Sequence, residues 1–404
     1  MVNRKHYTRQ IFAEALVGFV PTKPIRIFEP CCGDGSLLRA AGKAWPQARL
    51  EGIEWARKAA GVAAQSVPTA RIQVRDALST PWLVGGRRPC LVICNPPFNG
   101  ESSQAHNIRT DFRFFAKAFI AIKHGGTALL VVPFSVAANP SFLAWRRHVL
   151  AGFSLHSAIQ LPYNAFEDTD AAAVALVLTT EPVARTRFLE LTSHAKVANE
   201  VSSLVDASYR LDPHYYLSRA ALPRVAVPTL ALADFTTKVH RGRFIPIQRR
   251  RRRHRGAFGI VGLTELSGSP IRRFSSSASD VNTSGGDLLI SRVGRRAGLD
   301  VMLIQRESGA VVANDCAYIL TPKHLGGYLA AAFLTGYVRA QVLAVRRGMA
   351  ARVLSKDDLL RVRIPLLPKR RMSYFSEQWQ RHPERRARLL ARLNLVLFST
   401  TGRQ

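Results

Sequence analysis

The sequence is short of acidic residues and cysteines, and it lacks a long apolar run. Only 27 Asp and Glu residues stand against 58 Lys and Arg residues, so the 404-residue chain carries a formal net charge of +31. An excess of this size favours a polyanionic partner. The hydrophobic content of 47% excludes disorder as the main state of the chain, because disordered chains are poor in apolar residues.

The five cysteines are scattered along the chain and show no paired C-x-x-C spacing. This argues against a zinc site and against a disulfide framework, and it fits a reducing cytoplasm. No stretch reaches the roughly 18 uninterrupted apolar residues that a membrane span needs, and the N-terminus has no apolar segment behind its charges. We therefore expect a soluble cytoplasmic protein with no metal and no membrane partner.

Residues 24–180 alternate short apolar runs with helical patterns, which indicates a doubly wound α/β sheet with helices on both faces. Past Arg185 the chain turns to short segments rich in Ser, Gly, Pro and Arg. We place the boundary between residues 185 and 225, with a first domain at 1–205 and a strand-rich, mixed α/β, basic domain at 206–404. We expect strands at 25–28, 50–54, 71–74, 90–94, 127–132 and 172–178, and helices at 36–43, 112–123 and 376–398.

A glycine-containing loop follows the first expected strand and reads Glu29-Pro30-x-x-Gly33-x-Gly35. Sheets of this kind bind ligands at the carboxyl ends of their strands, and glycine lets the backbone approach a ligand closely. The spacing differs from the six-residue dinucleotide fingerprint, and no G-K-[ST] follows. A tight β–α turn is the plainer alternative.

Two carboxylates end the next two expected strands. Glu54 lies 19 residues after Gly35, where a carboxylate accepts hydrogen bonds from ribose hydroxyls. Asp76 could accept from the exocyclic amine of an adenine ring. Taken singly, each is better explained as a surface carboxylate; together with Gly33 and Gly35 they favour an adenosine-type cofactor.

The tetrapeptide Asn95-Pro96-Pro97-Phe98 follows the apolar strand expected at 90–94. Two prolines fix the backbone and remove two amide donors, which leaves carbonyls as acceptors beside the Asn side chain. Such a site can accept both hydrogens of a planar exocyclic NH₂ group while an aromatic ring stacks on the base. The alternative is a turn that merely ends the strand, because Asn and Pro are common turn residues.

The glycine loop followed by Asn95-Pro96-Pro97-Phe98 resembles the gamma class of S-adenosylmethionine-dependent DNA adenine-N6 methyltransferases, which includes modification enzymes of Type II restriction systems. The family has Thr-Pro near its N-terminus, where this chain has Thr8 and Arg9. Phe166 resembles the family's late aromatic that helps to hold the extruded base. The resemblance implies a Rossmann-like class I methyltransferase sheet and a cofactor site formed by Tyr7, Thr8, Glu29, Pro30, Cys31, Gly33, Gly35, Glu54, Asp76, Ala77 and Asn95.

The resemblance also implies the reaction. The methyl group passes directly to adenine N6, without a metal or a covalent enzyme intermediate. The Asn95 side-chain oxygen and the Pro96 carbonyl accept hydrogen bonds from N6, while Phe98 stacks on a base flipped out of the duplex. Asn95, Pro96, Pro97 and Phe98 are thus the predicted catalytic residues.

The C-terminal half resembles the target-recognition domains of Type I specificity subunits, on residues 211–216, 286–294, 312–315 and 348–368. Residues 201–404 carry 35 basic and 13 acidic residues, against 23 and 14 in residues 1–200. We expect a monomer that binds double-stranded DNA. A separately encoded restriction endonuclease is a further partner if the protein belongs to a restriction-modification system, and a solitary role is the alternative. The predicted DNA-binding residues are Arg249, Arg250, Arg251, Arg252, Arg253, Arg255, Arg292, Arg295 and Arg296, because runs of arginine neutralise phosphates.

Two other functions stay open at this point. The same tetrapeptide occurs in enzymes that methylate RNA adenine, cytosine N4 or protein glutamine. A non-catalytic DNA-binding specificity module would also carry the positive charge, although it has no physical need for the Asn95 site.

Overall fold

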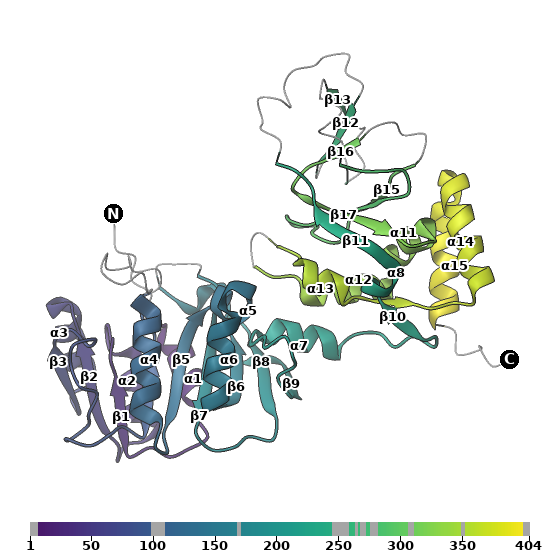
Figure 1. The fold of residues 1–404 in the computed structure, drawn as a ribbon. Helices are drawn as coiled ribbons and strands as arrows, with labels where there is room; N and C mark the ends of the chain where they lie inside the picture. Colours follow the sequence, from purple (N-terminus) through teal and green to yellow (C-terminus); the bar gives the residue numbers. More distant parts are fainter. Residues whose placement is uncertain are drawn as a thin grey trace. The chain divides into compact units, whose positions relative to one another are not determined.

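The structure is a computed structural model, and it describes residues 7–97, 110–167, 171–244, 258–262, 266, 272–274, 282–305, 311–348 and 352–398. The chain divides into two compact units, Met1–Leu217 and Ser218–Gln404 (Figure 1). The predicted domain boundary at 205/206 lies before this division. Each unit is described by itself.

The first unit is built on a nine-stranded sheet with the order β3-β2-β1-β4-β5-β7-β6-β8-β9. The first five strands along the chain pair in parallel, and β7 inserts antiparallel between β5 and β6. Their bounds are β1 (Arg26–Glu29), β2 (Arg49–Glu54), β3 (Ala70–Val74), β4 (Leu91–Cys94), β5 (Thr127–Pro133), β6 (Ser154–Gln160), β7 (Ala173–Thr179), β8 (Thr186–Leu191) and β9 (Val197–Ser203).

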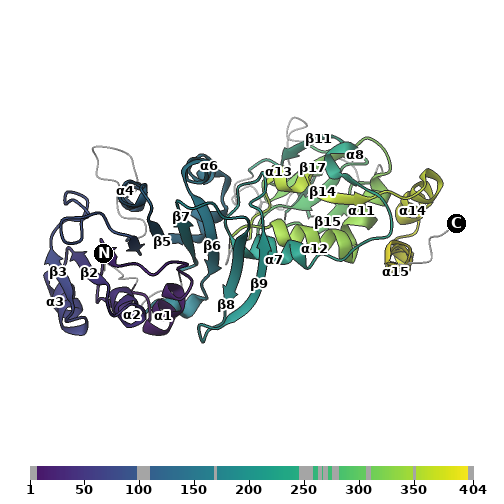
Figure 2. The ribbon, with the colours of Figure 1, turned by 90° about the horizontal axis from the view of Figure 1, so that it is seen from below.

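Helices cover both faces of this sheet (Figure 2). One face carries α1 (Gln10–Val17), α2 (Ser36–Ala44) and α3 (Arg57–Ser66), and the other carries α4 (Thr110–Ile122) and α6 (Leu143–Gly152). The short α5 (Phe134–Ala138) follows β5 directly. All residues of β4 are buried, as expected for a central strand enclosed on both faces. The doubly wound sheet predicted from the sequence is thereby confirmed.

The expected strands and helices of residues 24–180 are present, with ends shifted by one or two residues. Strands β6, β8 and β9 are not among the strands expected from the sequence. Because β8 and β9 pair with the sheet, the change of composition past Arg185 is not the edge of the sheet.

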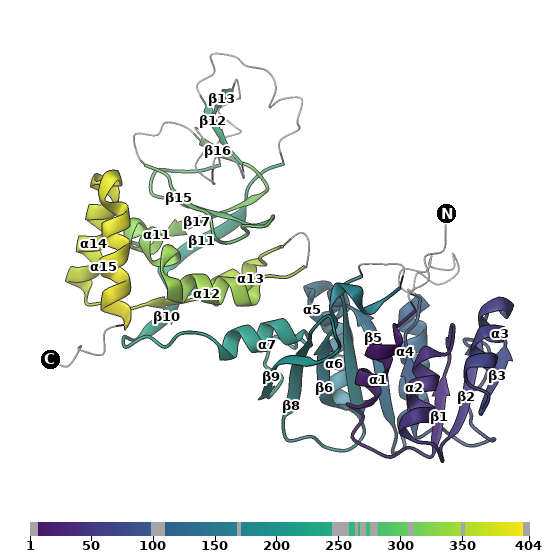
Figure 3. The same ribbon diagram turned by 180° about the vertical axis from the view of Figure 1, so that it is seen from behind.

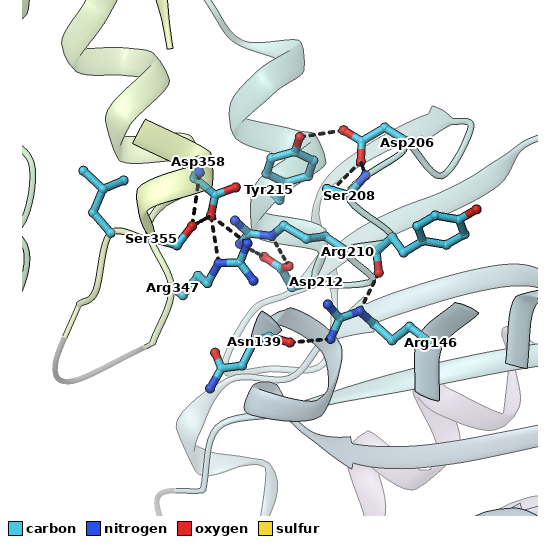
Figure 4. Close-up of polar contacts among 12 residues, drawn as sticks. Asn139, Arg146, Asp206, Ser208, Arg210, Asp212, Tyr215, Arg347, Ser355 and Asp358 are labelled. Carbon is cyan, nitrogen blue, oxygen red and sulfur yellow. Dashed lines mark hydrogen bonds and ion pairs between the residues drawn. The ribbon is translucent and has the colours of Figure 1, made fainter. Parts of the chain in front are cut away.

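Residues 209–212, assigned by the sequence analysis to the second domain, are held by the first unit (Figure 4). Arg210 and Asp212 form an ion pair at 2.7 Å, and both side chains are fully buried. The Arg146 guanidinium of α6 donates to the Tyr209 carbonyl at 2.5 Å, and the Leu211 N–H donates to a carbonyl of α5 at 3.0 Å. This segment is therefore anchored to α5 and α6.

The described residues of the second unit form three small sheets and a group of helices. The largest sheet has the order β11-β17-β14-β15, and all its pairs are antiparallel. Helix α7 (Pro213–Ala220) crosses the division between the units. The remaining strands and helices are β10 (Thr229–Ala231), α8 (Leu232–Phe235), β11 (Thr236–Arg241), β12 (Phe258–Val261), β13 (Arg272–Phe274), β14 (Leu288–Ser291), β15 (Val301–Leu303), β16 (Val311–Ala313), β17 (Ala317–Pro322), α11 (Gly326–Leu334), α12 (Gly336–Val345), α13 (Lys356–Leu360), β18 (Arg363–Pro365), α14 (Lys369–Arg381) and α15 (Arg386–Phe398).

The predicted helix at 376–398 is wrong in its extent. Two helices, α14 and α15, lie side by side in its place (Figure 3), separated by a 3₁₀ turn that begins at Pro383. A proline inside a helix removes a hydrogen bond and clashes with the preceding turn, so the chain breaks there. In α15, Leu389, Leu393 and Leu397 are buried.

Buried polar contacts also hold the second unit together. Arg347 pairs with Asp358 at 2.6 Å, and the Ser355 hydroxyl donates to the same carboxylate (Figure 4). Within the described residues, no single helix has the length and hydropathy of a membrane span. Taken together, helices α11 and α12 have the length and composition of a membrane span, but they meet at a bend of 73°.

Candidate functional site

A cavity of about 350 Å³ lies at the carboxyl ends of β1, β2, β3 and β4. Parallel strands bring the loops that follow them to one edge of the sheet, which explains why residues far apart in sequence meet here. Most of the predicted cofactor and catalytic residues line the cavity, namely Tyr7, Thr8, Glu29, Pro30, Cys31, Gly33, Glu54, Asp76, Ala77, Asn95, Pro96 and Pro97.

The loop between β1 and α2 needs its two glycines. Gly33 and Gly35 have φ values of 54° and 84°, in the left-handed region that favours glycine. A Cβ atom on Gly33 would lie 2.5 Å from the Tyr7 ring, and one on Gly35 would lie 3.1 Å from Ala63 Cα. The glycine at position 33 thus allows the Tyr7 ring to pack against the loop, whereas Gly35 allows α2 and α3 to approach each other.

Glu54 is fixed by the backbone at the end of β2. One carboxylate oxygen accepts the Gly33 N–H at 3.0 Å, and the other accepts the Ala56 N–H at 2.8 Å. A carboxylate oxygen has two acceptor positions, so each oxygen can accept one further hydrogen bond. The geometry suits a ligand that carries two neighbouring hydroxyl groups.

Glu29 is a carboxylic acid buried at the end of β1, with 2% of its surface exposed. Its Oε2 atom accepts no hydrogen bond from the described residues. Burial raises the pKa of Glu29 well above its usual value, and the nearby Cys94 and Asp34 add to this effect. A buried acceptor of this kind, lining the cavity, suits a hydrogen-bond donor of a ligand.

Asp76 forms a turn after β3. Its carboxylate accepts the Leu78 N–H at 2.8 Å, and its carbonyl accepts the hydroxyls of Ser79 and Thr80. The side chain is exposed, while Ala77 next to it is buried. An acceptor and an apolar surface therefore lie together, as an adenine ring requires.

Asn95 follows β4, and its side-chain amide is oriented by Thr8. Asn95 Nδ2 donates to Thr8 Oγ1 at 3.1 Å, so the nitrogen end of the amide points to Thr8 and the oxygen is its acceptor end. The Cys31 thiol donates to the Asn95 carbonyl at 3.3 Å. A hydrogen bond with Cys94 and burial raise the pKa of the Cys31 thiol, which keeps it neutral.

Of the described residues that the sequence predicts for the cofactor and base sites, Gly35 and Phe166 do not line the cavity. Phe166 is buried, and its backbone pairs with Thr8, which does line it. Phe98 and the residues Arg249, Arg250, Arg251, Arg252, Arg253 and Arg255 lie outside the described residues. The described arginines Arg292, Arg295 and Arg296 follow β14 in the second unit.

The cavity also has lining residues that the sequence analysis missed. Trp55 is 73% exposed and directly follows Glu54, so its position beside a predicted site residue was a usable signal. Phe114 belongs to α4, and no motif marks it. The other unanticipated residues are Asp34, Ser36, Leu37, Ala56 and Arg75. Among the described residues, no cluster of three His, Cys, Asp or Glu side chains could hold a metal ion.

No protein-family model and no curated protein sequence matches this chain. Among solved structures, the Type IIL restriction-modification enzyme MmeI in complex with DNA is similar over 93% of this chain and 66% of its own, with a TM-score of 0.56 and 12% identity. The type IIG restriction endonuclease BpuSI is similar over 96% and 65%, with a TM-score of 0.45 and 11% identity.

A modification subunit of a putative type I restriction enzyme from Vibrio vulnificus is similar over 46% of this chain, with a TM-score of 0.41 and 20% identity. This chain covers 47% of the length of that subunit. The likeness to MmeI shows the fold, which is a Rossmann-like methyltransferase sheet followed by a smaller, antiparallel, strand-rich region. In fold, the chain is thus similar to the restriction-modification enzyme MmeI.

Proposed function

We propose that this protein is a DNA methyltransferase that transfers a methyl group from S-adenosylmethionine to N6 of an adenine flipped out of double-stranded DNA. The observation that carries the proposal is that Asn95 and Pro96 share one cavity with the carboxylates of Glu54 and Asp76. An acceptor site for a planar amine thereby adjoins a site suited to adenosine. The fold likeness to MmeI supports the same conclusion.

The cavity residues fit the cofactor by their chemistry. Glu54 would accept hydrogen bonds from the ribose hydroxyls, and Asp76 would accept one from the adenine amine. The buried Glu29 carboxyl, which lines the cavity, would accept a hydrogen bond from the ammonium group of the methionine end. S-adenosylmethionine, when bound, supplies an electrophilic methyl group.

Asn95 and Pro96 prepare the target nitrogen. The Asn95 side-chain oxygen and the Pro96 carbonyl accept the two N6 hydrogens, which favours a pyramidal nitrogen with its lone pair directed out of the ring plane. Because Thr8 already orients the amide, little reorganisation is needed when the base enters. Phe98 would stack on the flipped base, and Phe166 would support it from the adjoining segment.

The second unit would bind the DNA. Its arginines Arg292, Arg295 and Arg296, together with those of residues 249–255, would neutralise phosphates and position the duplex. We assign residues 1–205 to catalysis and residues 206–404 to target recognition. A separately encoded restriction endonuclease would be the partner in a restriction-modification system.

The test is expression in a methylation-deficient bacterial host, followed by long-read sequencing of the host DNA for modified bases. Wild-type protein should leave N6-methyladenine at one short motif. Asn95→Ala should abolish the modification, because it removes an acceptor made for the transition state. Asn199→Ala, an exposed position on β9, is the matched control and should methylate like wild type.

Three outcomes would contradict the proposal. Soluble wild-type protein that leaves the genome unmodified, but labels RNA or protein with methyl from the cofactor, would move the activity to those substrates. N4-methylcytosine at the motif would change the target base. Binding of DNA without any cofactor-dependent product would indicate a specificity module without catalysis.

A further inference from the structure

Lys117 of α4 lies with its ammonium group against the loop that follows β3. Lys117 Nζ donates to three backbone carbonyls, those of Ala77 at 3.0 Å, Leu78 at 3.0 Å and Thr80 at 2.7 Å. It also lies 5.4 Å from the centre of the Trp82 ring, within the range of a cation–π contact. One side chain thus uses all three of its donors on a single short loop.

This loop carries one edge of the cavity. Asp76 and Ala77 line the cavity, and the Asp76 carboxylate and carbonyl shape the turn from within. The Ala77 carbonyl accepts a second hydrogen bond, from Trp82 Nε1 at 2.8 Å. The backbone of the turn therefore has its carbonyls directed toward α4, where a cation stabilises them together.

The same helix also supplies a wall of the cavity. Phe114 precedes Lys117 by three residues, a spacing that places both side chains on one face of a helix. Its side chain is 7% exposed and lines the cavity. Trp82 links this wall to the sheet, with its ring centre 6.3 Å from that of Phe114 and 5.5 Å from that of Phe28 in β1.

Lys117 is partly buried, so its charge carries a desolvation cost. Burial lowers the pKa of Lys117, while the nearby charge of Asp76 opposes this shift. A methionine of similar length would fill the same space without this cost. The three carbonyls offset the cost, so the energetic role of the ammonium lies in ordering the loop.

We infer that Lys117 is a positioning residue for cofactor binding, which holds the loop of Asp76 and Ala77 in the conformation that receives the adenine of S-adenosylmethionine. The inference rests on the proposed function for the identity of the cofactor. Lys117 is not among the residues that line the cavity, so it acts through the backbone of the loop.

The experiment compares Lys117→Met with Arg113→Met in the full-length protein. Arg113 is exposed and lies one turn before Lys117 on α4. Its substitution removes one positive charge from the same helix. Titration calorimetry with S-adenosylmethionine measures affinity, and amide hydrogen exchange of residues 76–82 measures the order of the loop. Lys117→Met should weaken cofactor binding roughly tenfold, because charge-assisted hydrogen bonds that order the site are lost.

The same variant should speed amide exchange in the loop, and it should raise KM for the cofactor more than it lowers kcat. Arg113→Met should match wild type in all of these measurements. Lys117→Gln keeps a donor without the charge and should give an intermediate affinity; it also replaces Lys117→Met if that variant does not fold.

The outcomes separate the inference from the proposed function. If wild type binds S-adenosylmethionine and both lysine variants bind it equally well, the inference is overturned while the proposed function stands. Faster loop exchange with unchanged affinity overturns it as well. If wild type binds the cofactor but methylates no DNA, the proposed reaction is wrong. The affinities of wild type and of the lysine variants for S-adenosylmethionine then still decide whether Lys117 supports cofactor binding. A wild type that binds no cofactor overturns both.

Discussion

Glu54 and Asn95 show how single residues are oriented before any ligand is bound. Two backbone N–H groups fix the Glu54 carboxylate, and Thr8 fixes the Asn95 amide. Side chains that are already in place lose little conformational entropy on binding. The cavity therefore has the preorganised acceptors that recognition of ribose and of an amine requires.

Glu29 should make the stability of the first unit depend on pH. Burial raises its pKa, so the folded protein keeps a proton that the unfolded chain releases above about pH 4.5. The stability contributed by this proton is present below that pH and is lost as the pH rises toward the raised pKa. Glu29→Gln has no such proton, so its unfolding free energy does not fall in this way. Between about pH 4.5 and the raised pKa, the unfolding free energy of the variant minus that of wild type should therefore increase by about 1.4 kcal/mol per pH unit.

Denaturant unfolding of both proteins at a series of pH values measures this difference. Glu200→Gln is the control, because a hydrogen bond with Arg187 lowers the pKa of Glu200 and gives a dependence of the opposite sign. Parallel stability curves for wild type and Glu29→Gln would show that Glu29 is ionised in the folded protein.

Residues at strand ends could be predicted from the sequence, whereas those on helices could not. Glu54, Asp76 and Asn95 each lie at the end of an expected strand, and parallel strands bring such positions together. Phe114 and Lys117 lie within a helix whose apolar pattern shows only which face is buried. Nothing in their local sequence points to the loop after β3.

At the scale of elements, the buried central strands were the easiest to predict. A strand enclosed on both faces, such as β4, is a continuous apolar run bounded by polar residues. β9 is different, because its residues are mostly exposed at the edge of the sheet. It pairs with β8 over its length, and that pairing depends on tertiary context that no local pattern carries.

The segment at residues 209–212 should be essential for the stability of the first unit. Asp212→Ala leaves the buried Arg210 guanidinium without its carboxylate, so we expect a loss of about 3 kcal/mol or more in unfolding free energy. Glu200→Ala removes the partly exposed pair with Arg187 and should cost less than about 1 kcal/mol. Urea denaturation measures both losses.

A double variant tests whether the cost comes from the unpaired charge. Arg210→Met combined with Asp212→Leu replaces the pair by apolar side chains and should recover much of the loss, since a buried ion pair contributes little beyond what such packing gives. Equal losses for Asp212→Ala and Glu200→Ala would show that the buried pair is no more important than a surface one.

At the scale of the whole molecule, the two units differ in charge, in agreement with the different functions proposed for them. The carboxylates of the cavity belong to the first unit, while residues 201–404 hold most of the excess positive charge. The sequence shows this asymmetry but not which arginines can meet a phosphate. In the structure Arg296 pairs with Asp300 at 2.6 Å, Arg292 donates to the Asp315 carbonyl at 3.0 Å, and Arg295 is exposed.

These differences lead to a prediction on salt dependence. Each phosphate contact releases counterions, so the logarithm of DNA affinity should fall linearly with the logarithm of salt concentration. Arg295→Ala should reduce that slope by about 1 and weaken binding to all duplexes alike, because a phosphate contact reads no sequence. Fluorescence anisotropy with a labelled duplex at several salt concentrations measures the slope. Lys123→Ala, an exposed cation of the first unit, should leave it unchanged; an unchanged slope for Arg295→Ala as well would place the phosphate contacts on other arginines.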